Sequence, residues 1–217
     1  MSGIVGSRLN TRGSGLVGSL GTDGQVFTSS GAGVSHTFED AAGGGAWTYI
    51  STTTASTATS VSVTSGIDST YDVYKMIISG LTIDTDDRRV DLRFYIDGSE
   101  HTASDYYYAF TGTHSSGGGS PYGGADAAFI LANYDSSESD STDALESEIT
   151  LFHPASTSLF KSVNFQSVNN SHTGALNATQ GSGRLESATA VTGLKFFLEG
   201  SGNLTGGTIR LYGINNS

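Results

Sequence analysis

A glycine pattern near the N-terminus has the spacing of a phosphate-binding turn. Gly13, Gly15 and Gly18 form G-x-G-x-x-G, and Glu39 follows at a distance suited to a ribose hydroxyl. That chemistry needs a buried strand before the first glycine and a helix after the third, so that the helix N-terminus meets the pyrophosphate. Here the residues NTR precede the pattern, and two further glycines interrupt SLGTDGQ, where the helix would form. The sequence therefore argues against a nucleotide site.

Two groups of carboxylates could supply oxygen ligands for calcium. Their spacing matches neither an EF-hand nor a glycine-rich calcium repeat, both of which need fixed glycines and fixed ligand offsets. Solvated acidic loops are the preferred interpretation, and calcium binding stays open as the alternative. The acidic residues are Asp84, Asp86, Asp87, Asp135, Glu138, Asp140, Asp143, Glu146 and Glu148.

The histidines show no catalytic or metal-binding spacing. H-x-H, H-E-x-x-H and G-x-S-x-G are all absent, and the chain has no cysteine. We therefore predict no catalytic residue, no metal site and no cofactor. A polysaccharide hydrolase is the less favoured alternative, because its paired carboxylates are recognised only by a separation of about 5–10 Å across a groove. The histidines are His36, His101, His114, His153 and His172.

Consecutive tyrosines mark a candidate recognition surface. A strand must place Tyr106, Tyr107 and Tyr108 on alternate faces, so at least one of them is expected at the surface. Exposed tyrosine suits contacts with proteins and sugars, because it offers a large area at little entropic cost. The simpler interpretation is core tyrosines plus an ordinary surface one. Tyr122 joins the candidates because it lies in the glycine-rich segment 112–126, which we expect to form a long loop.

Composition limits the classes of partner. The 217 residues fit one all-β domain plus an extension, and a net charge of −11 disfavours binding to nucleic acid and to anionic membranes. No apolar run approaches the length of a membrane span, so we expect neither membrane insertion nor a secretion signal.

Residues 1–45 differ from the rest of the chain. Glycine recurs every few positions, which disfavours helix and makes ordering costly. The segment is either a flexible linker or an extended arm that becomes ordered on another protein. Apolar residues placed regularly between the glycines favour the docking arm. They are Ile4, Val5, Leu9, Leu16, Val17, Leu20, Val26 and Phe27.

From residue 46 to residue 217 the pattern has a period of two. In VDLRFYID, residues 90–97, apolar and polar positions alternate, and Asp97-Gly98 then supplies a turn. No window shows helical periodicity. We therefore predict an all-β, antiparallel β-sandwich, jelly-roll-like, carrying an extended Gly-rich N-terminal arm. The expected strands are 47–51, 60–63, 74–79, 90–97, 105–110, 128–132, 148–152, 162–167, 194–200 and 208–214.

These features together resemble a family of bacteriophage structural proteins. GTDGQVFTSSGAG, residues 21–33, is similar to the G-T-x-G-Q-V-L-T-S-x-G-A-G segment of tail-fibre and other virion proteins, where a β-rich domain commonly follows. The body resembles one module of such proteins in YDVYKMIISGL, LRFYIDGS, LFHPASTSLFKSVNFQS and GGTIRLYGI. The resemblance covers residues 13–214.

The resemblance implies a virion protein assembled in a bacterial cytoplasm, a homotrimer in contact with other capsid or tail proteins. The chain lacks heptads, collagen-like repeats and a β-helical shaft, so a short tail fibre, a fibre tip or a head-decoration protein is expected. A carbohydrate-binding module that recognises host surface polysaccharide is the alternative.

Overall fold

A computed structural model describes residues 22, 25–28, 37–40, 46–137, 143–171 and 174–215. The chain divides into two compact units, Met1–Ala46 and Trp47–Ser217. Every regular element in the described ranges is a β-strand. Within them, no helix is long and apolar enough to cross a membrane.

The first unit contains a short antiparallel pair. β1 (Gln25–Thr28) pairs with β2 (Thr37–Asp40), and Phe27 lies opposite Phe38 in the register. The centroids of these two rings are 5.2 Å apart.

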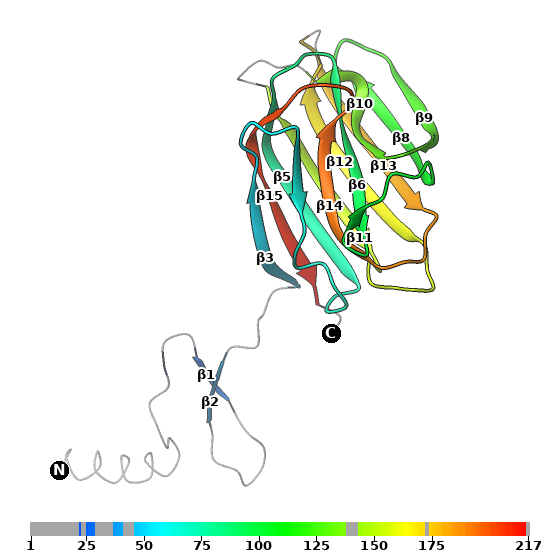
Figure 1. The fold of residues 1–217 in the computed structure, drawn as a ribbon. Helices are drawn as coiled ribbons and strands as arrows, with labels where there is room; N and C mark the ends of the chain where they lie inside the picture. The colour runs from blue at the N-terminus through cyan, green and yellow to red at the C-terminus, as the bar shows by residue number, and fades with distance from the viewer. Residues whose placement is uncertain are drawn as a thin grey trace, which may run out of the picture. The chain divides into compact units, whose positions relative to one another are not determined.

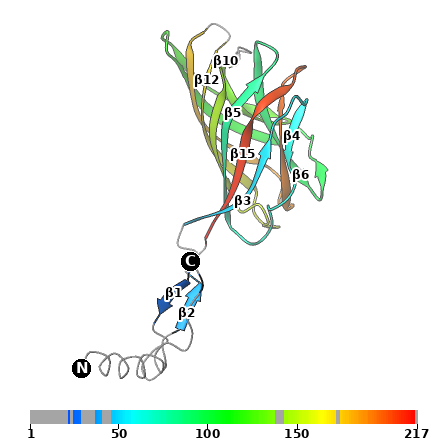
Figure 2. The same ribbon diagram turned by 90° about the vertical axis from the view of Figure 1, so that its left-hand side faces the viewer.

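The second unit is a sandwich of two antiparallel sheets that face each other (Figures 1 and 2). The large sheet has the order β3 (Trp47–Thr54), β15 (Leu204–Ile214), β5 (Val73–Ile83), β11 (Leu145–Phe152), β12 (Lys161–Asn170), β13 (Leu176–Leu185), β8 (Tyr106–His114) and β9 (Gly119–Asp126). The small sheet has the order β10 (Phe129–Ser137), β6 (Arg88–Ile96), β14 (Val191–Leu198) and β4 (Ser60–Val63), and β7 (Ser99–Glu100) pairs with β6. The predicted all-β antiparallel sandwich is confirmed.

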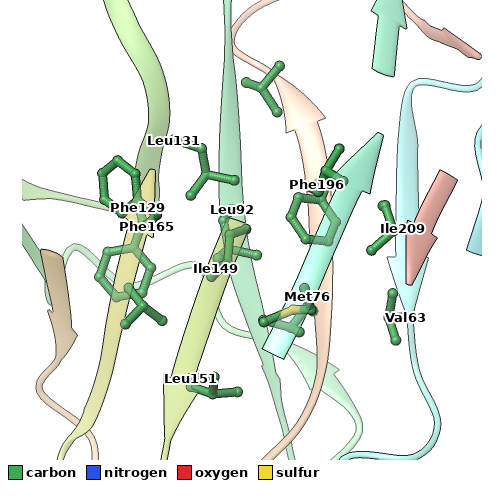
Figure 3. Close-up of a cluster of buried hydrophobic side chains, with 14 of the residues drawn as sticks. Val63, Met76, Leu92, Phe129, Leu131, Ile149, Leu151, Phe165, Phe196 and Ile209 are labelled. Atoms are coloured by element: carbon green, nitrogen blue, oxygen red, sulfur yellow. The ribbon is translucent and has the colours of Figure 1, made fainter. Parts of the chain in front are cut away.

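Alternation along the strands builds the core between the sheets. Met76, Ile149 and Phe165 point inward from the large sheet, and Leu92 and Phe196 meet them from the small sheet (Figure 3). All five side chains are 0–2% exposed. Complete burial of such a side chain contributes about 1.5–3 kcal/mol to the stability of the fold. Because apolar residues recur at every second position, the same pattern explains why these segments form strands and which face each strand buries.

The expected strands all fall on observed ones, and the predicted turn is confirmed. Asp97 and Gly98 have φ values of 50° and 75°, and they join Ile96 to its partner Ser99. Two consecutive residues with positive φ make the tight turn that fits the twist of paired strands.

The expected loop over 112–126 is wrong. β8 continues to His114, and β9 begins at Gly119 and pairs with β8 along its length. The glycines of this segment suggested a loop, yet pairing with a neighbouring strand overrides that local preference.

β13 was missed because its inward positions carry little apolar signal. Gly181 and Gly183 stand where inward side chains would be expected. A Cβ on Gly181 would lie 2.6 Å from the Phe165 ring, and one on Gly183 would lie 2.5 Å from the Phe129 ring. These glycines make room for aromatic rings from β12 and β10, and this close approach cannot be recognised from the sequence alone.

Gly183→Ala should lower the free energy of unfolding by about 1–2 kcal/mol. The added methyl group overpacks the Phe129 ring, and this cost exceeds the gain from a stiffer unfolded chain. The midpoint of urea unfolding measures the effect. Ser182→Ala, on the outward face of the same strand, is the matched control, and equal stability of the two variants would contradict this account of the core.

Candidate ligand-binding face

The consecutive tyrosines divide between the core and the surface. Tyr107 is 41% exposed, whereas Tyr106 is fully buried and Tyr108 is 8% exposed. Tyr106 and Tyr108 are therefore corrected from candidate surface residues to core residues. The Tyr106 hydroxyl donates to the His101 carbonyl at 2.8 Å and accepts from the Phe94 amide at 3.1 Å. Burial raises the pKa of Tyr106 far above its ordinary value.

Tyr122 lies on β9 and is 51% exposed. It pairs across the strands with Phe110, and its ring stacks on Tyr108 with centroids 6.3 Å apart. Because β9 is the edge strand of the large sheet, Tyr122 extends the aromatic core to the surface.

Only part of the predicted docking arm can be placed. Val26 and Phe27 lie on β1 and are 44% and 49% exposed. Six arm positions lie outside the described residues: Ile4, Val5, Leu9, Leu16, Val17 and Leu20.

The acidic groups do not form a metal cluster in the described part of the chain, where no set of three potential ligands comes together. The Asp84 carboxylate accepts from the backbone and side chain of Asn203, and these bonds lower its pKa. The Glu146 carboxylate accepts from the Gly80 amide at 2.8 Å. Positions 138 and 140 and the side chain at 135 lie outside the description, as do His36 and His172.

The described histidines lie apart. His101 pairs with Asp105 at 2.8 Å, His114 bonds to the Ser116 hydroxyl at 2.5 Å, and His153 approaches Asp72 at 3.9 Å. The expectation that the chain is not an enzyme stays a prediction.

Ion pairs occupy the face of the small sheet that points away from the core. Arg89 contacts the buried Asp91 at 3.0 Å. Glu100 bonds both Arg93, at 2.8 Å, and Lys195, at 2.7 Å. Burial raises the pKa of Asp91 to about 7, although the Arg89 guanidinium opposes that shift. Because these groups bind one another, this face offers few hydrogen-bonding groups to a ligand.

The outward face of the large sheet carries three adjoining shallow hollows. Their volumes are about 720, 690 and 790 Å³, within the range of small-ligand sites. The first shares Thr111 and Gln180 with the second, and Ala109 and Ser182 with the third. Together they form one groove over β11, β12, β13, β8 and β9, hereafter the outer groove.

Cross-strand pairing lines up polar side chains along the outer groove. Glu148 pairs with Gln166, Gln166 with Gln180, and Gln180 with Thr111. The row covers three strand spacings, roughly 14 Å. Glu148 forms an ion pair with Lys75 of β5. The members of this polar row are spread over four strands, so their proximity depends on the strand register.

An aromatic and cationic cluster closes one end of the outer groove. The guanidinium of Arg184 lies 5.6 Å from the ring centroids of both Tyr107 and Phe160. Phe160 lies at the end of the loop that precedes β12. The next residue, the buried Lys161, fixes this loop, because the Lys161 ammonium group donates to three backbone carbonyls. Of the predicted recognition residues, Tyr107 and Tyr108 line the hollow at this end, and Tyr107 is the exposed one.

Comparison with protein-family models, with curated proteins and with solved structures finds no match to this chain.

Tyr106→Phe should cost about 1–3 kcal/mol of unfolding free energy, because it leaves the Phe94 amide without its acceptor. Tyr107→Phe, the matched control, should stay within about 0.5 kcal/mol of the parent protein. Urea unfolding of both variants measures the difference. Equal losses would contradict the assignment of Tyr106 to the core and Tyr107 to the surface.

Asp91 should make the folded state less stable as the pH rises from about 4 to about 7. In this window the folded state keeps a proton that the unfolded chain, with its ordinary pKa of 3.8, has released. Stability is therefore lost as pH rises and levels off above about 7. Asp91→Asn should flatten the profile by at least about 1 kcal/mol relative to the parent protein. Urea unfolding across this pH range measures it, and identical profiles would contradict the buried state of Asp91.

Proposed function

We propose that this protein is a structural component of a bacteriophage particle, of the short tail-fibre or head-decoration type. Residues 1–45 attach it to other capsid or tail proteins, and residues 46–217 form the knob that the particle presents. The proposal includes assembly in the host cytoplasm and a homotrimeric state. It rests on the resemblance of GTDGQVFTSSGAG to the segment that precedes β-rich domains in virion proteins.

The division of the chain into two compact units supports the proposal. Among the described residues, the hydrophobic core draws every member from Ala55 to Leu211. Each of these described core residues belongs to the second unit. Attachment is a task that residues 1–45 suit, because their apolar residues are spaced between glycines.

The described strands of the first unit have the properties of a docking element. β1 pairs with β2 alone, so each strand keeps a free edge in the described structure. A two-stranded ladder is marginal by itself, and adding it to a sheet of another protein supplies backbone hydrogen bonds. Val26 and Phe27 provide exposed apolar area for the same contact.

Copy number separates the two forms of the proposal. A tail fibre is present in few copies on each particle, whereas a decoration protein covers the shell in many. Quantitative gel analysis of purified particles against the major capsid protein distinguishes them. Many copies turn weak single contacts into avidity, so neither form needs a tight attachment site on each chain.

Charge at β1 should block incorporation into particles. Val26→Asp combined with Phe27→Asp removes the apolar contact area, so particles assembled with this variant should lose the protein. Its sandwich should still unfold at the midpoint of the parent chain, because the core contains neither residue. The measurement is the amount of protein on purified particles.

Leu176→Asp is the matched control, since Leu176 is 49% exposed on the sandwich. That variant should incorporate normally. Normal incorporation of the β1 variant, or of a chain that lacks residues 1–45, would overturn the proposed role of the arm.

A further inference from the structure

The outer groove offers hydrogen-bonding groups that the protein itself leaves unused. In the described part of the chain, the side chains of Gln166, Gln180 and Thr111 make no hydrogen bond to the protein. Beside them, the Ser182 hydroxyl donates to the side-chain Oδ1 of Asn164 at 2.9 Å. This bond orients the Asn164 amide group and leaves its N–H donors for a ligand. Amides and hydroxyls both donate and accept, as do the hydroxyl groups of sugars.

Strands hold these groups in place. Each belongs to a strand paired on both sides, so the backbone positions are set by the ladder. A site built on rigid strands needs little ordering when a ligand binds. Small residues lie between the long polar side chains: Ala109 and Gly123 line the first hollow together with Gln166 and Gln180.

The described residues of the groove carry no excess of cations, because Glu146 also lines the second hollow and its carboxylate accepts from the Gly80 amide, and this disfavours an anionic ligand. Glu148 is paired with Lys75, and Arg184 is paired with Glu186. A polyanion such as nucleic acid would meet these carboxylates without an excess of cations, and the chain as a whole carries −11. An apolar ligand would leave the Gln166 and Gln180 amides desolvated and unbonded.

Tyr107 supplies the flat surface that a sugar ring requires. Its side chain is 41% exposed and lines the hollow at the end of the groove, next to Arg184. An amphipathic ring combines a large apolar face with a polar edge, which matches the apolar face and polar rim of a pyranose. The loop that Lys161 fixes places Phe160 beside Arg184, so the Arg184 guanidinium lies near both the Phe160 and the Tyr107 rings.

We propose that the outer groove binds a neutral oligosaccharide, with the rings of the sugar chain lying across β11, β12, β13 and β8 and one ring stacked on Tyr107. The inference goes beyond the proposed virion role and does not depend on it, because binding belongs to the sandwich. Glu148, Gln166, Gln180 and Thr111 would contact the hydroxyl groups.

Calorimetric titration of the full chain tests the inference. The probes are short neutral oligosaccharides of glucose, mannose, galactose, xylose and N-acetylglucosamine. At least one should bind, and Tyr107→Ala or the pair Gln166→Ala and Gln180→Ala should weaken that binding about tenfold. Tyr49→Ala, which removes a tyrosine 57% exposed on β3, is the matched control and should leave affinity unchanged. Unfolding midpoints verify that each variant is folded.

Two results would overturn the inference: no binding by any of these sugars, or binding that the groove variants leave intact. Binding of an oligonucleotide or an acidic polysaccharide in preference to neutral sugars would also overturn it. Since incorporation into particles is measured separately, failure here leaves the attachment role standing, and failure of the attachment role leaves the groove standing.

Discussion

The sandwich depends on the space that two glycines leave beneath its aromatic core. Gly181 and Gly183 of β13 face the interior, and the rings of Phe165 and Phe129 fill the positions that their side chains would need. Interiors are close-packed, so these rings can enter only where the backbone is bare. Through Phe129, β10 packs over β13 and its neighbours. The same strand turns Gln180 outward, so packing inside the sandwich positions the polar groove outside it.

The two outward faces of the sandwich use polar residues in opposite ways. On the small sheet, arginine and lysine side chains contact Asp91 and Glu100 at hydrogen-bonding distance. On the large sheet, the amides of Gln166 and Gln180 keep their hydrogen-bonding capacity. A buried network of ion pairs raises or lowers the stability of the fold, depending on how many of its charged groups find hydrogen-bond partners. Uncharged exposed amides cost little when free, and they suit binding.

The two units would let the proposed attachment and the proposed sugar binding be distinct properties of one chain. The described core residues all belong to the second unit, and Val26 and Phe27 of β1 are exposed. Many copies on one particle would make weak sugar contacts effective together, because avidity multiplies modest affinities. Attachment and the outer groove thus fit the same architecture without either depending on the other.

Local sequence predicts the strands of period two, such as 90–97, and the turn at Asp97-Gly98, because alternation and positive φ are local properties. It also determined that one of the three consecutive tyrosines must reach the surface. The packing of the folded chain is needed to show that Tyr107 is that residue, and that 112–126 belongs to a hairpin. The outer groove likewise required the tertiary structure, because its side chains come from strands far apart in the chain. Their proximity depends on strand order and register, which no local pattern encodes.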